Sequence, residues 1–139
     1  MLSKAELQHE LGVSVIGRKL FVFEEIDSTN LCAKVMADAG TEEGAVVIAD
    51  HQTAGRGRRG RTWVDARGDN LLYSILLRPA LSTDDLARLT FLVATAVART
   101  VHATGNLTAE CKWPNDVLID GKKVCGILVE NGVANGIAQ

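Results

Sequence analysis

The spacing of apolar residues along the chain predicts three short strands and two helices. Runs rich in β-branched and aromatic residues at 19–25, 45–50 and 71–78 are typical of strands, and the continuous run at 45–50 predicts a buried strand. Helical spacing occurs at 27–39, behind a polar cap, and at 82–104. The predicted core stripe of the longer helix consists of Leu86, Leu89, Val93, Val97 and Val101.

Caps and turns mark further elements on either side. An S-x-x-E capping box predicts a short helix at about 3–12. Strands are expected at 107–113, 117–119 and 122–130, and Asp120-Gly121 between the last two is the strongest short hairpin signal in the chain. The order of elements favours an α+β fold, a mixed β-sheet flanked by helices, over regular βαβ alternation.

Composition narrows the class of protein. The chain has 139 residues, of which 47% are apolar and 23% are charged, and this composition is ordinary for a soluble globular domain. Its net charge of −2 argues against a surface covered in positive charge that would bind nucleic acid. Cys32, Cys111 and Cys125 are odd in number and lie in apolar runs, so we expect reduced, buried thiols. No apolar stretch is long enough to span a bilayer, and we expect a cytoplasmic protein.

Residues 52–63, here called the arginine loop, are the least ordinary part of the chain. Four arginines and three glycines fall between Gly55 and Arg61. Glycine lets a backbone lie close to a ligand, and arginine offers a fixed fork of donors for phosphate or carboxylate. The loop therefore predicts a cationic flap that closes on an anion.

Several other interpretations of the arginine loop compete. Residues 55–60 fit the dinucleotide fingerprint G-x-G-x-x-G, but that motif needs a helix opening inside it, whereas loop-forming residues follow here. A Walker-type phosphate loop is excluded, because Gly-Lys-Ser/Thr is missing. Nucleic-acid binding is a minor option without a wider basic face. A solvated surface loop is the structural alternative.

Three more blocks accompany the loop in a fixed order. They are Ser28-Thr29-Asn30, Lys112-Trp113-Pro114-Asn115-Asp116 and the run 123–130. Together with the loop they resemble the catalytic domain of biotin protein ligases, over roughly residues 20–132. The resemblance implies a mixed sheet flanked by helices, similar to class II aminoacyl-tRNA synthetases and shared with lipoate ligases.

The resemblance implies an ATP-dependent ligase that forms a C–N bond in two steps. Biotin's carboxylate attacks the α-phosphate of ATP to give biotinyl-5′-AMP, and a lysine of a biotin carboxyl carrier protein domain then displaces AMP. Because one anion attacks another in the first step, cations are needed where charge accumulates, normally Mg²⁺ with arginine and lysine. The catalytic residues so implied are Arg56, Arg58, Asp116 and Lys123.

Binding residues follow from the same resemblance. Those for biotin are Ser28, Thr29, Asn30, Gln52, Arg56, Gly57, Arg58, Lys123, Gly126 and Leu128. Those for the adenylate are Arg58, Trp63, Lys112, Asn115 and Lys123. No side chain is implied as a metal ligand. DNA and membrane partners are not expected, and a homodimer is left open.

Each motif also has a purely structural interpretation. Ser28-Thr29-Asn30 is typical of a helix cap, Asn115-Asp116 after a proline is ordinary turn chemistry, and Lys122 is expected to be solvated. Trp113 ends an apolar strand and is expected in the core. His51 has no evident partner for acid–base chemistry, so the sequence assigns it no role.

Two alternatives to a biotin ligase stay open. One is a lipoate or octanoate ligase or transferase on the same fold, and the other is a truncated biotin-binding domain with little turnover. We expect one catalytic domain over 1–139, with its core at about 20–132. We also expect no N-terminal DNA-binding domain and no C-terminal β-barrel domain. The missing C-terminal parts would leave an exposed strand edge at 124–130.

Overall fold

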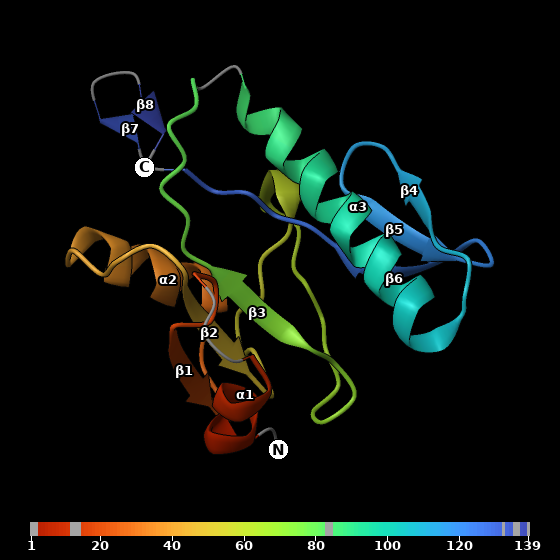
Figure 1. Ribbon diagram of the computed structural model, residues 1–139, viewed down its shortest axis with the longest axis horizontal. Helices are drawn as coiled ribbons and strands as arrows, with labels where there is room; N and C mark the ends of the chain where they lie inside the picture. Colours follow the sequence, from red (N-terminus) through yellow and green to blue (C-terminus); the bar gives the residue numbers. More distant parts are fainter. Residues whose placement is uncertain (1–2, 12–14, 83–84, 132, 135–136, 139) are drawn as a thin grey trace. The chain divides into compact units, whose positions relative to one another are not determined.

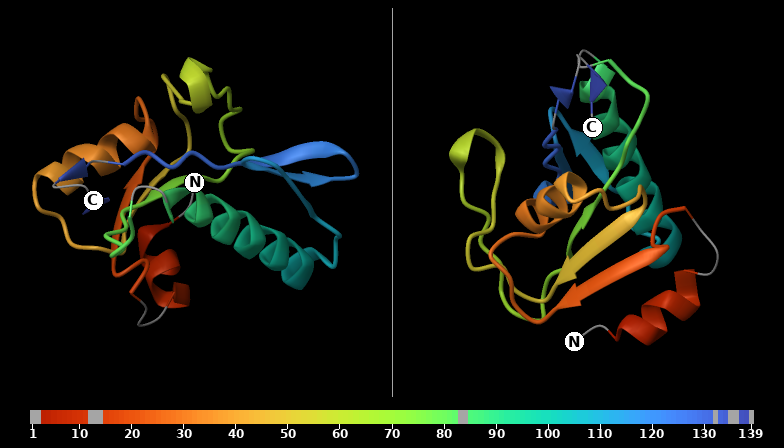
Figure 2. Two further views of the ribbon diagram at one scale, coloured as in Figure 1. Left: turned by 90° about the horizontal axis from the view of Figure 1, so that it is seen from above. Right: turned by 90° about the vertical axis from the view of Figure 1, so that its left-hand side faces the viewer.

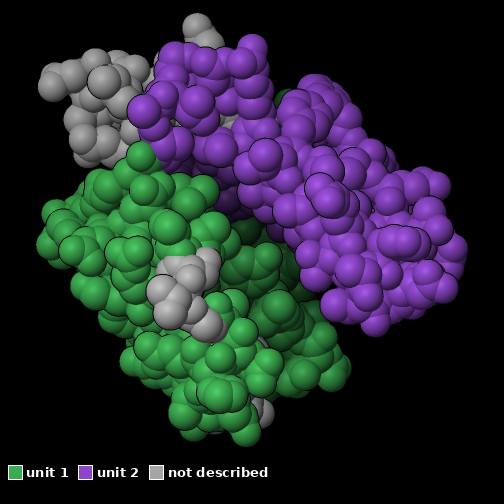
Figure 3. Space-filling view, viewed as in Figure 1, with its two compact units in different colours: residues 1–78 green, residues 79–139 purple. Residues whose placement is uncertain are grey.

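The computed structural model describes residues 3–11, 15–82, 85–131, 133–134 and 137–138 (Figure 1). The chain forms two compact units, Met1–Arg78 and Pro79–Gln139, which are coloured separately in Figure 3.

A three-stranded mixed sheet forms the centre of the first unit. Its strands are β1 (Lys19–Phe23), β2 (Ala45–Ala49) and β3 (Leu72–Ile75), in the order β1-β2-β3. Strand β1 runs parallel to β2, and β3 runs antiparallel to it. All five residues of β2 are buried, as expected for a central strand with both faces covered. The strands predicted at 19–25, 45–50 and 71–78 are therefore confirmed, although each is shorter than expected.

Helices α1 (Lys4–Leu11) and α2 (Thr29–Asp38) pack against this sheet. Leu20, Val46 and Ile48 form a core cluster on one face, against which Leu7 of α1 packs. Ser74 belongs to the other face by strand alternation, and its hydroxyl contacts the first turn of α2. Figure 2 shows the two helices on opposite sides of the strands. Ser74 thus places a polar group of the sheet where α2 begins.

The second unit consists of a long helix and an antiparallel sheet. Helix α3 spans Leu86–Gly105, and strands β4 (Glu110–Lys112), β5 (Asp116–Ile119) and β6 (Lys122–Gly126) follow in the order β4-β5-β6. A two-residue pair, β7 (Val133–Ala134) and β8 (Ile137–Ala138), lies beyond them. The β5–β6 turn has positive φ at both Asp120 (49°) and Gly121 (74°), which confirms the predicted hairpin.

A small apolar core holds this unit together. Ala94, Val117 and Ile127 are buried, and Val93 and Val97 of the predicted helical stripe pack against them. Leu89 and Val101 are half-buried, whereas the side chain of Leu86 lies outside the described residues. The stripe is thus confirmed at Val93 and Val97, although the most deeply buried helix residue is an alanine.

Two predictions of burial are wrong. Trp113 is 76% exposed rather than in the core, and Cys111 is also exposed. Both follow from the length of β4, which has only three residues, all exposed, and ends at Lys112. All three cysteines are free thiols, but Cys32 and Cys125 are only half-buried, so none of them is buried as predicted. Within the described ranges, α3 and the shorter helices lack the length and apolar character needed to cross a bilayer.

Candidate functional site

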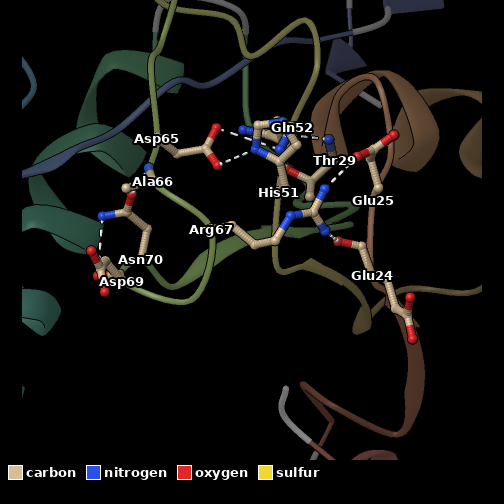
Figure 4. Close-up of polar contacts among 10 residues, drawn as sticks. All are labelled: Glu24, Glu25, Thr29, His51, Gln52, Asp65, Ala66, Arg67, Asp69 and Asn70. Atoms are coloured by element: carbon tan, nitrogen blue, oxygen red, sulfur yellow. Dashed lines mark hydrogen bonds and ion pairs between the residues drawn. The ribbon is translucent and has the colours of Figure 1, made fainter.

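A buried polar group connects α2, β3 and the start of the arginine loop. Gln52 Oε1 accepts two hydrogen bonds from Thr29, one from the backbone N–H at 2.8 Å and one from Oγ1 at 3.0 Å (Figure 4). A backbone N–H can only donate, so this contact identifies the oxygen end of the Gln52 amide. The remaining end, Nε2, can only donate. Gln52 therefore presents a donor of fixed orientation.

Ser74 extends this polar group to Asn30. Its Oγ donates to Thr29 Oγ1 at 2.9 Å. Its second contact is with Asn30 Oδ1, the amide oxygen, which accepts. The single hydroxyl proton of Ser74 is therefore shared between two acceptors. Asn30 is thus joined through Ser74 to Thr29 and Gln52.

Ser28 has a different task from its neighbours. Its Oγ accepts a hydrogen bond from Leu31 N at 3.4 Å, and its extended backbone makes it the N-cap of α2. Both Ser28 and Thr29 are buried. The structural interpretation of this motif is thus confirmed for Ser28, whereas Thr29 and Asn30 belong to the polar group.

The arginine loop folds as a narrow hairpin that projects away from the sheet of its unit, drawn in yellow-green in Figure 2. Trp63 N donates to Gly55 O at 2.9 Å, Gly57 N donates to Arg61 O at 2.7 Å, and a 3₁₀ turn at Arg58–Gly60 forms the tip. Residues 52–63 contain no α-helix, so the dinucleotide fingerprint interpretation is wrong.

The glycines have separable roles in this hairpin. A Cβ on Gly55 would lie 2.5 Å from Trp63 O, so only glycine permits the two arms to approach. Gly60 has φ +72° but open space around it. An open hollow of about 250 Å³ is lined by backbone and side chains of both arms, including Arg56 and Thr62. All four arginines of the loop are exposed.

In the second unit, Lys123 and Asp116 form an ion pair, with Lys123 Nζ 2.8 Å from Asp116 Oδ1. Lys123 lies opposite Leu118, and a register shift between Val117 and Leu118 makes Val124 the extra residue of a bulge. The tight turn between β5 and β6 fixes the pairing of Lys123 with Leu118, and Asp116 shares the face of Leu118 by strand alternation. The turn therefore places the ammonium group beside the carboxylate, and the bulge changes the register only beyond Lys123.

The pair is close in distance but imperfect in geometry. Asp116 Oδ1 is buried, and within the described part of the chain no hydrogen bond of good angle reaches it, even though Lys123 Nζ is near. Lys123 is 42% exposed and Asp116 25% exposed. The ammonium therefore remains accessible to a ligand, and the buried oxygen can still accept a well-aligned donor.

The other predicted residues of this unit lie around the pair. Register places Lys112, Asp116 and Gly126 side by side across the three strands. Asn115 holds the segment after β6, since its Nδ2 donates to Ile127 O at 3.0 Å and its carbonyl accepts from Ile127 N at 2.9 Å. Leu128 follows and is half-buried. Asn115 thus positions the segment after β6, a role that the sequence did not predict when it assigned Asn115 to the adenylate.

Cys125 reports on the electrostatics beside this pair. Burial raises the pKa of its thiol, the nearby Lys123 lowers it, and Asp116 raises it again, with a net increase. Burial also raises the pKa of Cys32 in the first unit, with a smaller contribution from Asp27.

Metal ligation by side chains has little support in the parts of the chain that are described. They contain no group of three or more His, Cys, Asp or Glu residues arranged to hold an ion. Mg²⁺ in nucleotide sites commonly keeps several waters and binds through substrate phosphates.

Sequence reasoning missed two residues that contact the candidate site. Ser74 bonds to Thr29 and Asn30, and Asp65 contacts both His51 and Gln52. Ser74 carried a signal, since it is a small polar residue inside the apolar run 71–77. Asp65 carried none, because only the folded loop shows that its carboxylate returns to the loop's beginning.

Comparison with known proteins shows the family to which the chain belongs. The profile of the biotin/lipoate A/B protein ligase family matches residues 22–139, and the chain belongs to this family. The bifunctional ligase/repressor BirA of Bacillus spizizenii is 40% identical over 129 residues, covering 93% of this chain and 40% of the relative. A biotin--[acetyl-CoA-carboxylase] ligase of Paracoccus denitrificans is 43% identical over 107 residues, covering 76% of this chain and 44% of the relative.

Solved structures agree with the sequence comparison. The biotin protein ligase of Aquifex aeolicus in complex with biotin and ATP has a TM-score of 0.71 at 30% identity, covering 87% of this chain and 49% of that one. The Leishmania major enzyme in complex with biotinyl-5-AMP has a TM-score of 0.64 at 28% identity, covering 87% and 54%. These matches confirm the predicted fold class. The chain spans about half the length of these relatives or less.

Proposed function

We infer that this chain supplies the biotin-recognising and adenylate-forming part of a biotin protein ligase. The observation that carries the inference is the oriented Gln52 amide at the base of a hairpin with four arginines. The Gln52 amide suits a neutral ring with donors and acceptors, and the arginines suit an anion. Biotin and its adenylate combine both, and relatives with these ligands share the fold.

Recognition of the ureido ring would fall to the polar group in the first unit. The ring has a carbonyl acceptor and two N–H donors, which must be matched when buried. Gln52 Nε2 is the donor suited to an acceptor on the ligand, since Oε1 is already occupied by Thr29. Asn30 and the backbone at Gly57 would complete this wall, and Leu128 would supply apolar surface for the acyl tail.

Adenylation would depend on arginine and lysine side chains. A carboxylate oxygen of biotin attacks the α-phosphorus of ATP, the bond to the β-phosphate oxygen breaks, and pyrophosphate leaves. Arg56, Arg58 and Lys123 are the cations that we assign to the accumulating charge, with Lys112 as a further one. Mg²⁺ would enter with ATP and neutralise phosphate charge. Trp63 would cover the adenylate.

Transfer would use the carboxylate in the second unit. The lysine amine of a biotin carboxyl carrier protein attacks the biotinyl carbonyl, and AMP leaves with the electron pair of the anhydride bond. We assign Asp116 to orient Lys123 or to accept a hydrogen bond from the incoming amine, because its buried Oδ1 lacks a well-aligned donor. We place this reaction in the cytoplasm, in a catalytic domain with its core at about 20–132.

Pyrophosphate exchange into ATP tests the first step with the chain as it exists. We expect exchange that requires biotin and is not supported by lipoate or octanoate. Exchange with lipoate alone would establish the sibling activity in place of the biotin ligase. Tight biotin binding without exchange would show that this chain recognises biotin but does not activate it.

A further inference from the structure

The hairpin formed by the arginine loop, here called the arginine hairpin, is held at its base by a contact that the proposed chemistry does not use. Asp65 follows the hairpin, and its side chain is only 1% exposed. Its Oδ2 lies 2.8 Å from His51 Nδ1, and its Oδ1 accepts a long hydrogen bond of 3.4 Å from Gln52 N. Figure 4 shows this carboxylate turned toward both residues. A carboxylate that is buried and paired in this way requires its partners, because burying it alone is costly.

The two arms of the hairpin are anchored by different means. On the entry arm, the backbone continues the parallel pairing of β1 and β2, since Thr53 N donates to Ile26 O and Ala54 N donates to Asp27 O, both at 2.9 Å. On the exit arm, the carboxylate of Asp65 makes the connection through its side chain. Arg67, two residues on, also ties this segment to Glu24 O and to the Glu25 carboxylate, but those contacts are exposed, whereas the Asp65 carboxylate is buried.

The same carboxylate reaches the biotin-recognition group through the backbone of Gln52. Asp65 contacts Gln52 N, and the Gln52 side chain accepts both bonds from Thr29. The position of the hairpin base and the position of the Gln52 amide are thus fixed by one set of contacts. A shift of the exit arm would move both.

We propose that Asp65, with His51, is a positioning residue that closes the base of the arginine hairpin and holds Gln52 for ligand recognition. The part of this role that concerns biotin rests on the proposed function. Neither residue needs to touch the ligand. Their loss lets the hairpin open and moves the Gln52 donor, so that ligand binding weakens and an adenylate becomes more exposed to water.

The first test measures opening of the hairpin without any ligand. Trypsin cleaves after arginine, so the rate of nicking at Arg56–Arg61, located by mass spectrometry, reports how often the hairpin opens. We expect Asp65→Ala and His51→Ala each to increase this rate about tenfold, which corresponds to about 1.4 kcal/mol of opening free energy. The double variant should be no faster than Asp65→Ala, because that variant already removes the contact with His51.

Matched variants control for general loss of structure. Asp69→Ala removes an exposed carboxylate of the same segment and should leave nicking unchanged. Asp65→Asn keeps an acceptor for Gln52 N and should lie between the unaltered chain and Asp65→Ala. If Asp65→Ala fails to fold, Asp65→Asn and His51→Ala carry the test. Unchanged nicking in both overturns the proposal.

The second test separates this role from the proposed function. In pyrophosphate exchange, Asp65→Ala should raise KM for biotin about tenfold and increase release of biotinyl-AMP, with a smaller effect on KM for ATP. Unchanged kinetics would overturn the link to Gln52. If the unaltered chain shows no biotin-dependent exchange while Asp65→Ala still accelerates nicking, the proposed function fails and the fastening of the hairpin stands.

Discussion

The two units divide the candidate chemistry between unlike kinds of polar contact. In the first, Thr29, Gln52 and Ser74 are neutral, largely buried, and bonded to one another in a fixed direction. In the second, Lys123 and Asp116 are charged, partly exposed and imperfectly aligned. A neutral network of this kind fixes orientation and suits recognition of a ring whose polar groups never change. A partly exposed ion pair suits a reaction in which charge develops and departs.

The largest expected effect tests the charged side of this comparison. Lys123→Met should lower biotin-dependent pyrophosphate exchange by about 10²–10³-fold, the usual loss when one transition-state charge partner is removed. Recognition of the biotin ring should be impaired much less than adenylation. Lys122→Met is the matched control, because that neighbour is exposed and belongs to the same turn. Equal losses in both variants would mean that Lys123 has no special role.

Arg58→Ala should behave like Lys123→Met, with strongly reduced exchange and nearly unchanged recognition of the biotin ring. Arg59→Ala, at the tip of the same turn, provides the comparison within the loop. Thermal unfolding distinguishes chemistry from folding. A fall in Tm with proportional loss of both exchange and biotin binding would favour a purely structural loop.

A third change bears on whether the hairpin shape itself matters. Gly55→Ala places a Cβ 2.5 Å from Trp63 O and should break the bond between the arms. Overpacking of this kind costs about 1–3 kcal/mol, so we expect roughly a tenfold to hundredfold loss of exchange. Gly60→Ala has open space and only a positive φ to overcome, so its effect should be smaller. The reverse order would contradict the assigned roles of these glycines.

Thr29→Val tests the neutral polar group of the first unit, because it preserves the shape of the side chain and removes one hydroxyl. Gln52 keeps its bond from the Thr29 backbone, whereas Ser74 loses its acceptor. The cost of one such bond is about 1 kcal/mol, so biotin affinity measured by calorimetry should fall roughly fivefold to tenfold. The rate of exchange at saturating biotin should be nearly unchanged. A large loss of rate instead would place Thr29 among the catalytic groups.

The same comparison explains what the sequence could predict. Local signals sufficed for β2, with its continuous apolar run, and for the hairpin at Asp120-Gly121, where turn chemistry determines the backbone. Ser28 as a cap was also within reach. The register shift beyond Lys123 was not, because a bulge depends on pairing between strands. Asp65 was missed for the same reason, since its partners become neighbours only when the loop closes.

The smallest expected effect uses Cys125 to sense the ion pair directly. Its pKa is raised by burial, lowered by Lys123 and raised by Asp116, and only the thiolate reacts with an alkylating agent. Lys123→Met should therefore slow alkylation of Cys125 at pH 8 by a few-fold, and Asp116→Asn should accelerate it. Cys32 is the internal control, because burial and Asp27 set its pKa. The raised pKa also means that the stabilisation from Cys125 is present below pH 9 and is lost as the pH rises through the folded-state pKa. Equal alkylation rates in both variants would show that Lys123 and Asp116 do not act on Cys125 in solution, and would contradict the ion pair from which we assign their roles.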